Sequence, residues 1–319
     1  MILYHASHEQ FPPGQLLQLA RLAEQCGFEG IHSSDHFFPW SERQGQSAFS
    51  FAWMGAAMQA TSIPCGMICA PGQRYHPAIV AQAAATLAAM FPGRYWLELG
   101  SGEALNEKIT GGDWPLKAER NQRLKECADI IRRLMAGETV THTGTVTVHE
   151  ARLYTRPEQA PPLIGAALSV ETAEWMGGWA DGMVTISKPA EELKELVAAF
   201  RRGGGAGKPL YLKVQLSYHQ SEQAAVDGAY DQWRTNVLPG DLAGDMWKVS
   251  QFDAVAEFVR PEDVQKMVHI SARLDEHLEC LKTYQALGFD HLILHNVNRE
   301  QEAFIKDFGA HVLPALKSS

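Results

Sequence analysis

Short apolar runs alternate with segments of helical periodicity along most of the chain. Several of these runs are apolar nearly throughout, which is typical of strands in a parallel sheet that has helices on both faces. The predicted strands cover residues 2–6, 29–35, 65–70, 94–100, 162–167, 181–186, 210–217 and 290–296. The predicted helices lie near residues 14–26, 50–60, 77–90, 117–136, 169–178, 190–202, 221–235 and 299–313.

The unbroken order of these strand–helix pairs predicts the fold class α/β and, within it, a closed (β/α)8 TIM barrel in one domain of residues 1–319. A doubly wound sheet is the alternative, but the first strand is followed by "SHEQFPPG", which is not a glycine-rich dinucleotide turn. Two stretches depart from the alternation. Residues 139–153 predict a surface β-hairpin. The long insertion at 234–273 fits either a lid over the site or a packed decoration.

Composition and charge narrow the class of protein. The formal net charge is −9, so we expect no nucleic-acid partner and no anionic membrane surface. The five cysteines are an odd number spread through apolar segments, which is typical of a reducing compartment. The first residues lack the features of a signal peptide, and no apolar run is long enough for a membrane helix. We therefore expect a cytoplasmic protein.

Polar residues follow several of the predicted strands. Glu9 comes after the first strand, Asp35 and His36 after the second, and Glu103 after the fourth. Because chemistry in a barrel takes place at the carboxyl ends of its strands, we expect these side chains to share one pocket with Trp40. Each also has a structural interpretation: hydrogen bonding or capping for His36 and Asp35, the helix dipole for Glu103, and core packing for Trp40.

A metal-dependent hydrolase is a competing interpretation, because barrels of that class use histidines at strand ends. The usual His-x-His after the first strand is absent, and the chain has His5 and His8 instead. His32 and His36 lie where a strand passes into a loop, and their four-residue spacing does not align side chains there. We therefore expect no metal site.

Three stretches resemble a known family. "SSDHFFPW", the block of residues 73–107 and "GFDHLILH" are similar to the luciferase-like flavin oxidoreductases, in the branch that contains coenzyme F420-dependent glucose-6-phosphate dehydrogenase. Within that branch, the chain resembles most a subgroup expected to bind FMN. The resemblance implies a TIM barrel, a flavin-dependent monooxygenase acting on a small organic molecule, a flavin reductase as partner, and a homodimer. Two alternatives stay open: a coenzyme F420-dependent dehydrogenase of a small alcohol or sugar, and a flavin-binding protein without turnover.

The resemblance also implies roles for single residues. His36 would face the central ring of the flavin as a base or proton donor, and an imidazole can exchange protons near neutral pH. Trp40 would form a wall of the site, Glu103 would lie near the pyrimidine edge of the ring, and Glu9 would be a second carboxylate near the substrate. Asp35 would anchor the turn. The expected catalytic residues are thus His36, Glu103, Trp40 and Glu9.

The expected cofactor contacts lie on several loops. The family has a non-proline cis peptide at the end of its third strand, which corresponds to Met67–Ile68. Ser169 and Thr172, with the helix that follows them, would hold a phosphate. The deazaflavin enzymes have Gly-Gly-Pro at that place, and this difference favours FMN over coenzyme F420. The expected cofactor-binding residues are Asp35, Met67, Ile68, Ala70, Ser101, Gly102, Asn106, Ala166, Ala167, Ser169 and Thr172.

The residues that would bind a sugar phosphate differ from the family pattern. In "TISKP", Lys188 is shifted by one place and Ile186 replaces a threonine, while Lys266 matches another cation only loosely. We therefore do not expect glucose 6-phosphate to be the substrate.

Overall fold

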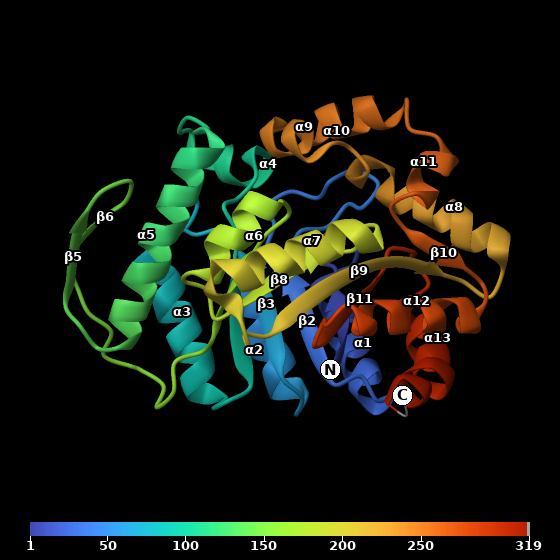
Figure 1. The fold of residues 1–319 in the computed structure, drawn as a ribbon, viewed down its shortest axis with the longest axis horizontal. Coiled ribbons are helices and arrows are strands. Elements are labelled where there is room, and N and C mark those ends of the chain that lie inside the picture. The colour runs from blue at the N-terminus through green and yellow to red at the C-terminus, as the bar shows by residue number, and fades with distance from the viewer. Residues whose placement is uncertain (318–319) are drawn as a thin grey trace.

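Eight parallel strands close into a barrel in the computed structural model, which describes residues 1–317 (Figure 1). The strands follow one another around the barrel in chain order, and β11 closes it by pairing with β9 on one side and with β1 on the other. Their bounds are β1 Ile2–Ala6, β2 Gly30–Ser34, β3 Cys65–Cys69, β4 Tyr95–Leu99, β7 Leu163–Ala166, β8 Gly182–Ile186, β9 Leu210–Tyr218 and β11 His291–Asn296. The predicted barrel is confirmed.

Helices separate these strands along the chain and surround the barrel (Figure 1). They are α1 Pro13–Gln25, α2 Ser50–Ala60, α3 Pro77–Met90, α5 Lys117–Met135, α6 Val170–Gly177, α7 Ala190–Phe200, α12 Leu274–Ala286 and α13 Gln301–Asp307. Short helical segments add α4 Ala104–Glu107, a 3-10 turn at Lys108–Thr110, π-helical turns at Arg201–Gly205 and Phe308–Val312, and α14 Leu313–Lys317.

The sequence prediction missed α12, the helix that connects β9 to β11. Its segment is rich in charged residues, and only His277 and Leu281 are buried. An apolar face this narrow gives little helical periodicity in the sequence. The helix predicted at 221–235 is confirmed as α8 (Glu222–Trp233). It is the first element of the insertion and not the helix that leads into β11.

The insertion is folded and packs on the site loop. It continues from α8 through a 3-10 turn at Arg234–Asn236 to α9 (Gly240–Asp245), α10 (Val249–Ala256), α11 (Pro261–Gln265) and the short strand β10 (His269–Ser271), which pairs with the carboxyl end of β9. Figure 1 shows α9 and α10 beside α4. Phe252 and Met246 pack with Leu105 and Trp40 in one apolar cluster. The insertion thus covers one side of the loop that carries His36.

The predicted hairpin is confirmed. Strands β5 (Val140–Thr143) and β6 (Thr147–Ala151) pair antiparallel and lie beside α5, away from the barrel (Figure 1). No helix among residues 1–317 is both long and apolar enough to cross a membrane.

The barrel interior begins with an apolar layer. Trp96 and Tyr211 stack across it with ring centroids 5.8 Å apart. Trp96 lies directly on Gly66 of the neighbouring strand, where an added Cβ would be 1.9 Å from the indole. The layer consists of Leu3, Trp96, Ile164, Val184, Tyr211 and Ile293. It fills the barrel below the carboxyl ends of the strands, where barrel enzymes carry their sites.

The predicted cis peptide between Met67 and Ile68 is wrong, because the described residues contain no cis peptide bond. Both residues pair with β2 on one side and with β4 on the other, with Met67 opposite Ser33 and Leu97. A regular parallel ladder on both sides of a strand requires extended trans backbone. The pairing of β3 therefore leaves no room for a cis bond at this point.

Candidate functional site

The four predicted catalytic side chains meet at the carboxyl end of the barrel, around His36. The Nδ1 atom of His36 lies 2.5 Å from Oε1 of Glu9, and its Nε2 atom lies 3.8 Å from Oε2 of Glu103. The contact of Glu9 with His36 becomes an ion pair when the imidazole is protonated. The Trp40 ring meets the imidazole edge to face, with centroids 5.1 Å apart.

Glu9 is held in place by two hydroxyl groups. Ser7 Oγ donates to one carboxylate oxygen over 2.7 Å, and Ser34 Oγ donates to the other over 2.9 Å. Burial alone would raise the pKa of Glu9, but His36, Lys213 and Ser7 together hold it well below its usual value. Glu9 is therefore a fixed carboxylate behind the imidazole.

The pKa of His36 is set by burial and by neighbouring carboxylates. Burial lowers the pKa of the imidazole, but the carboxylates of Glu9 and Glu103 outweigh burial and raise it above 6.5. With Nδ1 turned to Glu9, the neutral ring presents the Nε2 lone pair towards Glu103, whose side chain is 39% exposed. The site can therefore take up or release a proton at Nε2.

Asp35 points away from His36. Its carboxylate accepts a hydrogen bond from Nη2 of Arg74 over 2.9 Å, and Nε of Arg74 lies 3.4 Å from Glu107. All three side chains are at most 6% exposed. This buried cluster fixes the turn that carries His36, and Asp35 contributes no free group to the pocket.

Asn106 links the two halves of the site. Its Oδ1 accepts hydrogen bonds from the backbone N–H groups of Phe37 and Phe38, at 2.8 and 3.1 Å, and its Nδ2 donates to Glu103 over 3.3 Å. The loop after β2 and the turn after β4 therefore hold a fixed relative position.

Small and apolar residues line the barrel mouth beside His36. A Cβ placed on Gly100 would lie 3.8 Å from Ile68 and 3.9 Å from Ala166, so these three residues form one surface. Gly102 has a φ of +81°, and a Cβ there would lie 3.2 Å from Ala70. Ser101 and Gly102 are both half-buried in this turn.

Two predicted cofactor residues, Met67 and Ala167, point elsewhere. Their side chains are fully buried in the core between barrel and helices, so only their backbone can reach the mouth. Ser169 caps α6: its Oγ accepts a hydrogen bond from Thr172 N–H over 3.3 Å and donates to Thr172 Oγ1 over 3.1 Å. These two residues lie at the helix terminus after β7, as predicted.

The prediction missed a polar network inside the barrel. His5 and His32 face each other with Nδ1 atoms 2.9 Å apart, and Nε2 of His32 lies 3.0 Å from Glu98. The indole N–H of Trp96 donates to the other Glu98 oxygen over 2.9 Å. Lys213, on β9, belongs to the same interior, since the carboxylates of Glu9, Glu98 and Glu103 all act on its charge. A signal was available: a charged residue or a histidine interrupts each of the runs "ILYHA", "GIHSS", "YWLEL" and "LYLKVQLSY".

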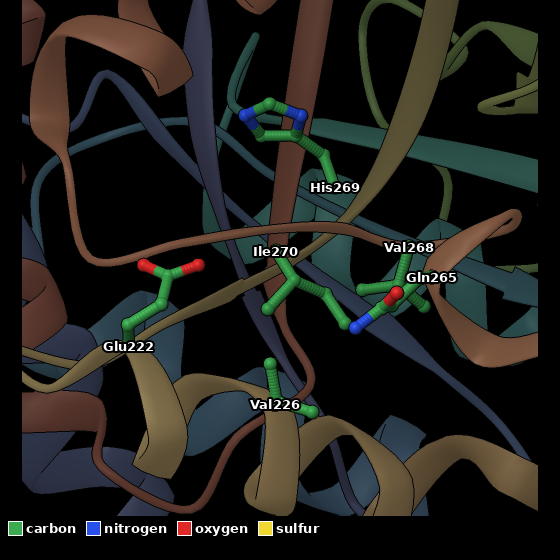
Figure 2. Close-up of a pocket in the computed structure, with 6 residues that line it drawn as sticks. All are labelled: Glu222, Val226, Gln265, Val268, His269 and Ile270. Atoms are coloured by element: carbon green, nitrogen blue, oxygen red, sulfur yellow. The ribbon is translucent and has the colours of Figure 1, made fainter. Parts of the chain in front are cut away.

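Two surface depressions lie apart from these residues. One, of about 330 Å³, lies between α8 and β10 and is shown in Figure 2. The other, of about 500 Å³, lies between α5 and the hairpin. None of the residues that line them belongs to the predicted site. The first is lined by Glu222, Val226, Gln265, Val268, His269 and Ile270 (Figure 2).

Comparison with known proteins agrees with this geometry. The profile of the luciferase-like monooxygenase family matches residues 2–291. An F420-dependent glucose-6-phosphate dehydrogenase of Microbacterium testaceum (strain StLB037) is 36% identical over 325 residues, which cover 98% of this chain and 96% of the relative.

Solved structures are similar over the whole chain. An F420-dependent secondary alcohol dehydrogenase, solved in complex with an F420–acetone adduct, superposes with a TM-score of 0.93 at 30% identity and covers 99% of this chain and 98% of its own. The monooxygenase RslO1 from Streptomyces bottropensis superposes with a TM-score of 0.75 at 18% identity, over 98% of this chain and 99% of its own, and shows the fold alone. The chain is therefore an oxidoreductase that belongs to the luciferase-like monooxygenase family.

Proposed function

We propose that the protein is a dehydrogenase that uses coenzyme F420 and oxidises a small, uncharged alcohol. The relative from Microbacterium testaceum and the secondary alcohol dehydrogenase structure described above, both at least 30% identical over nearly the whole chain, are F420-dependent dehydrogenases, and these support the F420 alternative over the FMN monooxygenase that the sequence favoured. The observation that carries the proposal is the contact of His36 with Glu9, Glu103 and Trp40 at the barrel mouth.

The barrel mouth fits a flat ring system. Ile68, Gly100 and Ala166 form a surface without bulky polar side chains, and all three are half-buried. Ala70 and Gly102 extend this surface, and Ser169 and Thr172 at the start of α6 are suited to a phosphate. Coenzyme F420, when bound, supplies a two-electron acceptor for the hydride that leaves the alcohol carbon.

The residues of the chain supply the proton chemistry. An alcohol that loses a hydride must also lose its hydroxyl proton, and Nε2 of His36 is placed to accept it. Glu9, at 2.5 Å from Nδ1, stabilises the imidazolium that forms and fixes the orientation of the ring. Trp40, packed on Phe252 of the insertion, forms the wall of the site beside the imidazole.

The charges near the mouth favour an uncharged substrate. Lys188 donates to the backbone oxygen of Leu168 over 2.9 Å and lies 3.6 Å from Glu192. Lys266 is exposed directly after α11 and pairs with Asp263 at 2.9 Å. Both lysines predicted as loose matches to phosphate ligands therefore have other partners, and the carboxylates of Glu9 and Glu103 would repel a phosphate dianion.

The test is to supply purified protein with either cofactor. With coenzyme F420 and 2-propanol, we expect the absorbance of the oxidised cofactor to decline and acetone to form in equal amount. Glucose 6-phosphate should give less than about a hundredth of that rate, because the carboxylates of Glu9 and Glu103 oppose the phosphate dianion and Lys188 and Lys266 already have partners. Turnover only with reduced FMN and oxygen would instead make the protein a monooxygenase, and F420 binding without turnover of any alcohol would leave it a binding protein.

A further inference from the structure

Lys213 is a cation inside the barrel that has no direct partner. It lies in the middle of β9, two residues from Tyr211 of the apolar interior layer, so the alternation of the strand turns it inwards. No hydrogen bond or ion pair within residues 1–317 reaches its ammonium group. The side chain of Lys213 is half-buried, and burial opposes the charge that it carries.

The nearby carboxylates already have other partners. Glu9 accepts hydrogen bonds from two serines and faces His36, and Glu98 is shared by His32 and Trp96. Glu103 receives a hydrogen bond from Asn106 and faces the other side of the imidazole. The ammonium of Lys213 therefore acts on these groups through space, as an unpaired charge below the mouth.

We propose that Lys213 is a positioning residue of the proposed reaction: its charge opposes those of Glu9 and Glu103 and keeps His36 free to accept a proton. The inference rests on the proposed function, since it concerns the proton acceptor of that reaction. A carboxylate in contact with each ring nitrogen would by itself hold His36 as an imidazolium, which cannot act as a base.

The directions of the pKa shifts that Lys213 causes agree with this proposal. Lys213 lowers the pKa of His36, of Glu9 and of the interior histidines His5 and His295. Burial lowers the pKa of Lys213 itself, and three carboxylates oppose that loss of charge. The charged and titratable groups around His36 are Glu9 and His8 after β1, Asp35 beside it after β2, Glu103 after β4, and Lys213 on β9.

The first measurement needs no cofactor. The ring of His36 is titrated by NMR in ¹⁵N-histidine-labelled protein, with its signal assigned by its loss in His36→Gln. In Lys213→Met we expect the midpoint to rise by roughly one pH unit, the size expected when a like charge on the order of 10 Å away is removed at an effective dielectric constant near 20. Glu9→Gln should move it in the opposite direction.

Two variants serve as controls. Lys213→Arg keeps the charge and should keep the midpoint, and Lys194→Met removes an exposed lysine that pairs with Glu191 on α7. Lys213→Gln takes the place of Lys213→Met if the latter does not fold. An unchanged or lowered midpoint in the neutral variants, or an equal rise in Lys194→Met, would overturn the inference.

The second measurement is the pH profile of alcohol oxidation with coenzyme F420. The pH at which kcat reaches half of its plateau should be higher in Lys213→Met by the same amount as the NMR midpoint. The value of kcat on the plateau at high pH should stay the same. A shifted midpoint with an unshifted profile would show that Lys213 tunes His36 but that His36 is not the base, which contradicts the proposed function. If the natural protein has no F420 turnover, the proposed function fails and the NMR titration alone decides the effect of Lys213.

Discussion

His36 has two ring nitrogens in different surroundings, and this asymmetry defines the chemistry of the site. Nδ1 faces the buried carboxylate of Glu9, and Nε2 faces the half-exposed Glu103 and the barrel mouth. The arrangement is that of a carboxylate–imidazole pair, in which the acid fixes the tautomer and the second nitrogen exchanges the proton.

Replacing His36 by Gln should affect the chemical step alone. The barrel surface, the phosphate loop and Asn106 remain, so coenzyme F420 should bind with unchanged Kd, while kcat for alcohol oxidation should drop about 10²–10⁴-fold. In the natural protein, kcat should rise with pH through the raised pKa of His36, above 6.5. Stopped-flow reduction of the bound cofactor and a binding titration check both points.

His149→Gln is the matched control, because this histidine lies on the hairpin with its side chain 82% exposed. A half-reaction that stays as fast in His36→Gln as in His149→Gln would leave His36 a structural residue.

At the scale of elements, the side chain of Trp96 on β4 lies across β3 at a position that requires glycine. Gly66 lies under the indole of Trp96, and Trp96 in turn stacks on Tyr211 across the barrel. The packing of the apolar layer therefore requires glycine at position 66.

Gly66→Ala should destabilise the protein by about 1–3 kcal/mol or more, because its Cβ would meet the indole ring at 1.9 Å. Urea denaturation followed by circular dichroism measures the loss. Gly14→Ala is the matched control, since a Cβ at that position on α1 has no atom within 4 Å. The double variant Gly66→Ala, Trp96→Leu should recover part of the stability, and equal stabilities of the two single variants would contradict this account.

The sequence predicts the elements of the barrel better than it predicts the contacts between them. Apolar runs such as "YWLELG" predict a buried strand whatever its neighbours in the sheet are. The bounds of the eight barrel strands are therefore predicted nearly to the residue. His36, Glu9 and Glu103 are found because they follow strands whose carboxyl ends must meet. The role of Lys213 is missed because periodicity does not say which residues of a strand face the barrel axis. The contact of Asp35 with Arg74 depends on side-chain directions, which have no signal in a single sequence.

At the scale of the whole molecule, several apolar side chains on and just before helices α2 and α3 are exposed. Ile79 and Met90 on α3 are each 57% exposed, and Phe49 before α2 is 53% exposed. Ala52 and Ala56 of α2 are exposed too, so both helices show small and apolar residues to solvent. A surface of this kind is typical of a contact between protein subunits.

We expect the protein to form a homodimer through α2 and α3, which light scattering after size-exclusion chromatography would measure. Ile79→Asp should shift the mass from two chains towards one, because it places a charge in an apolar contact. Tyr154→Asp, at a residue 91% exposed beyond the hairpin, should not. A natural protein that elutes with the mass of one chain would refute the expectation.

The closure of the barrel also has a consequence for how the protein is made. The amino group of Met1 bonds to the carbonyl oxygen of Asp290, 289 residues later, and β1 pairs there with β11. At about 5–20 residues per second, a ribosome needs roughly 15–60 s to deliver that partner strand. During this interval Glu9, His36 and Glu103 have all been synthesised, yet one edge of β1 stays unpaired and open to other nascent chains. The nascent chain therefore contains its site residues well before the barrel can close. We expect it to depend on chaperones most strongly just before β11 leaves the ribosome.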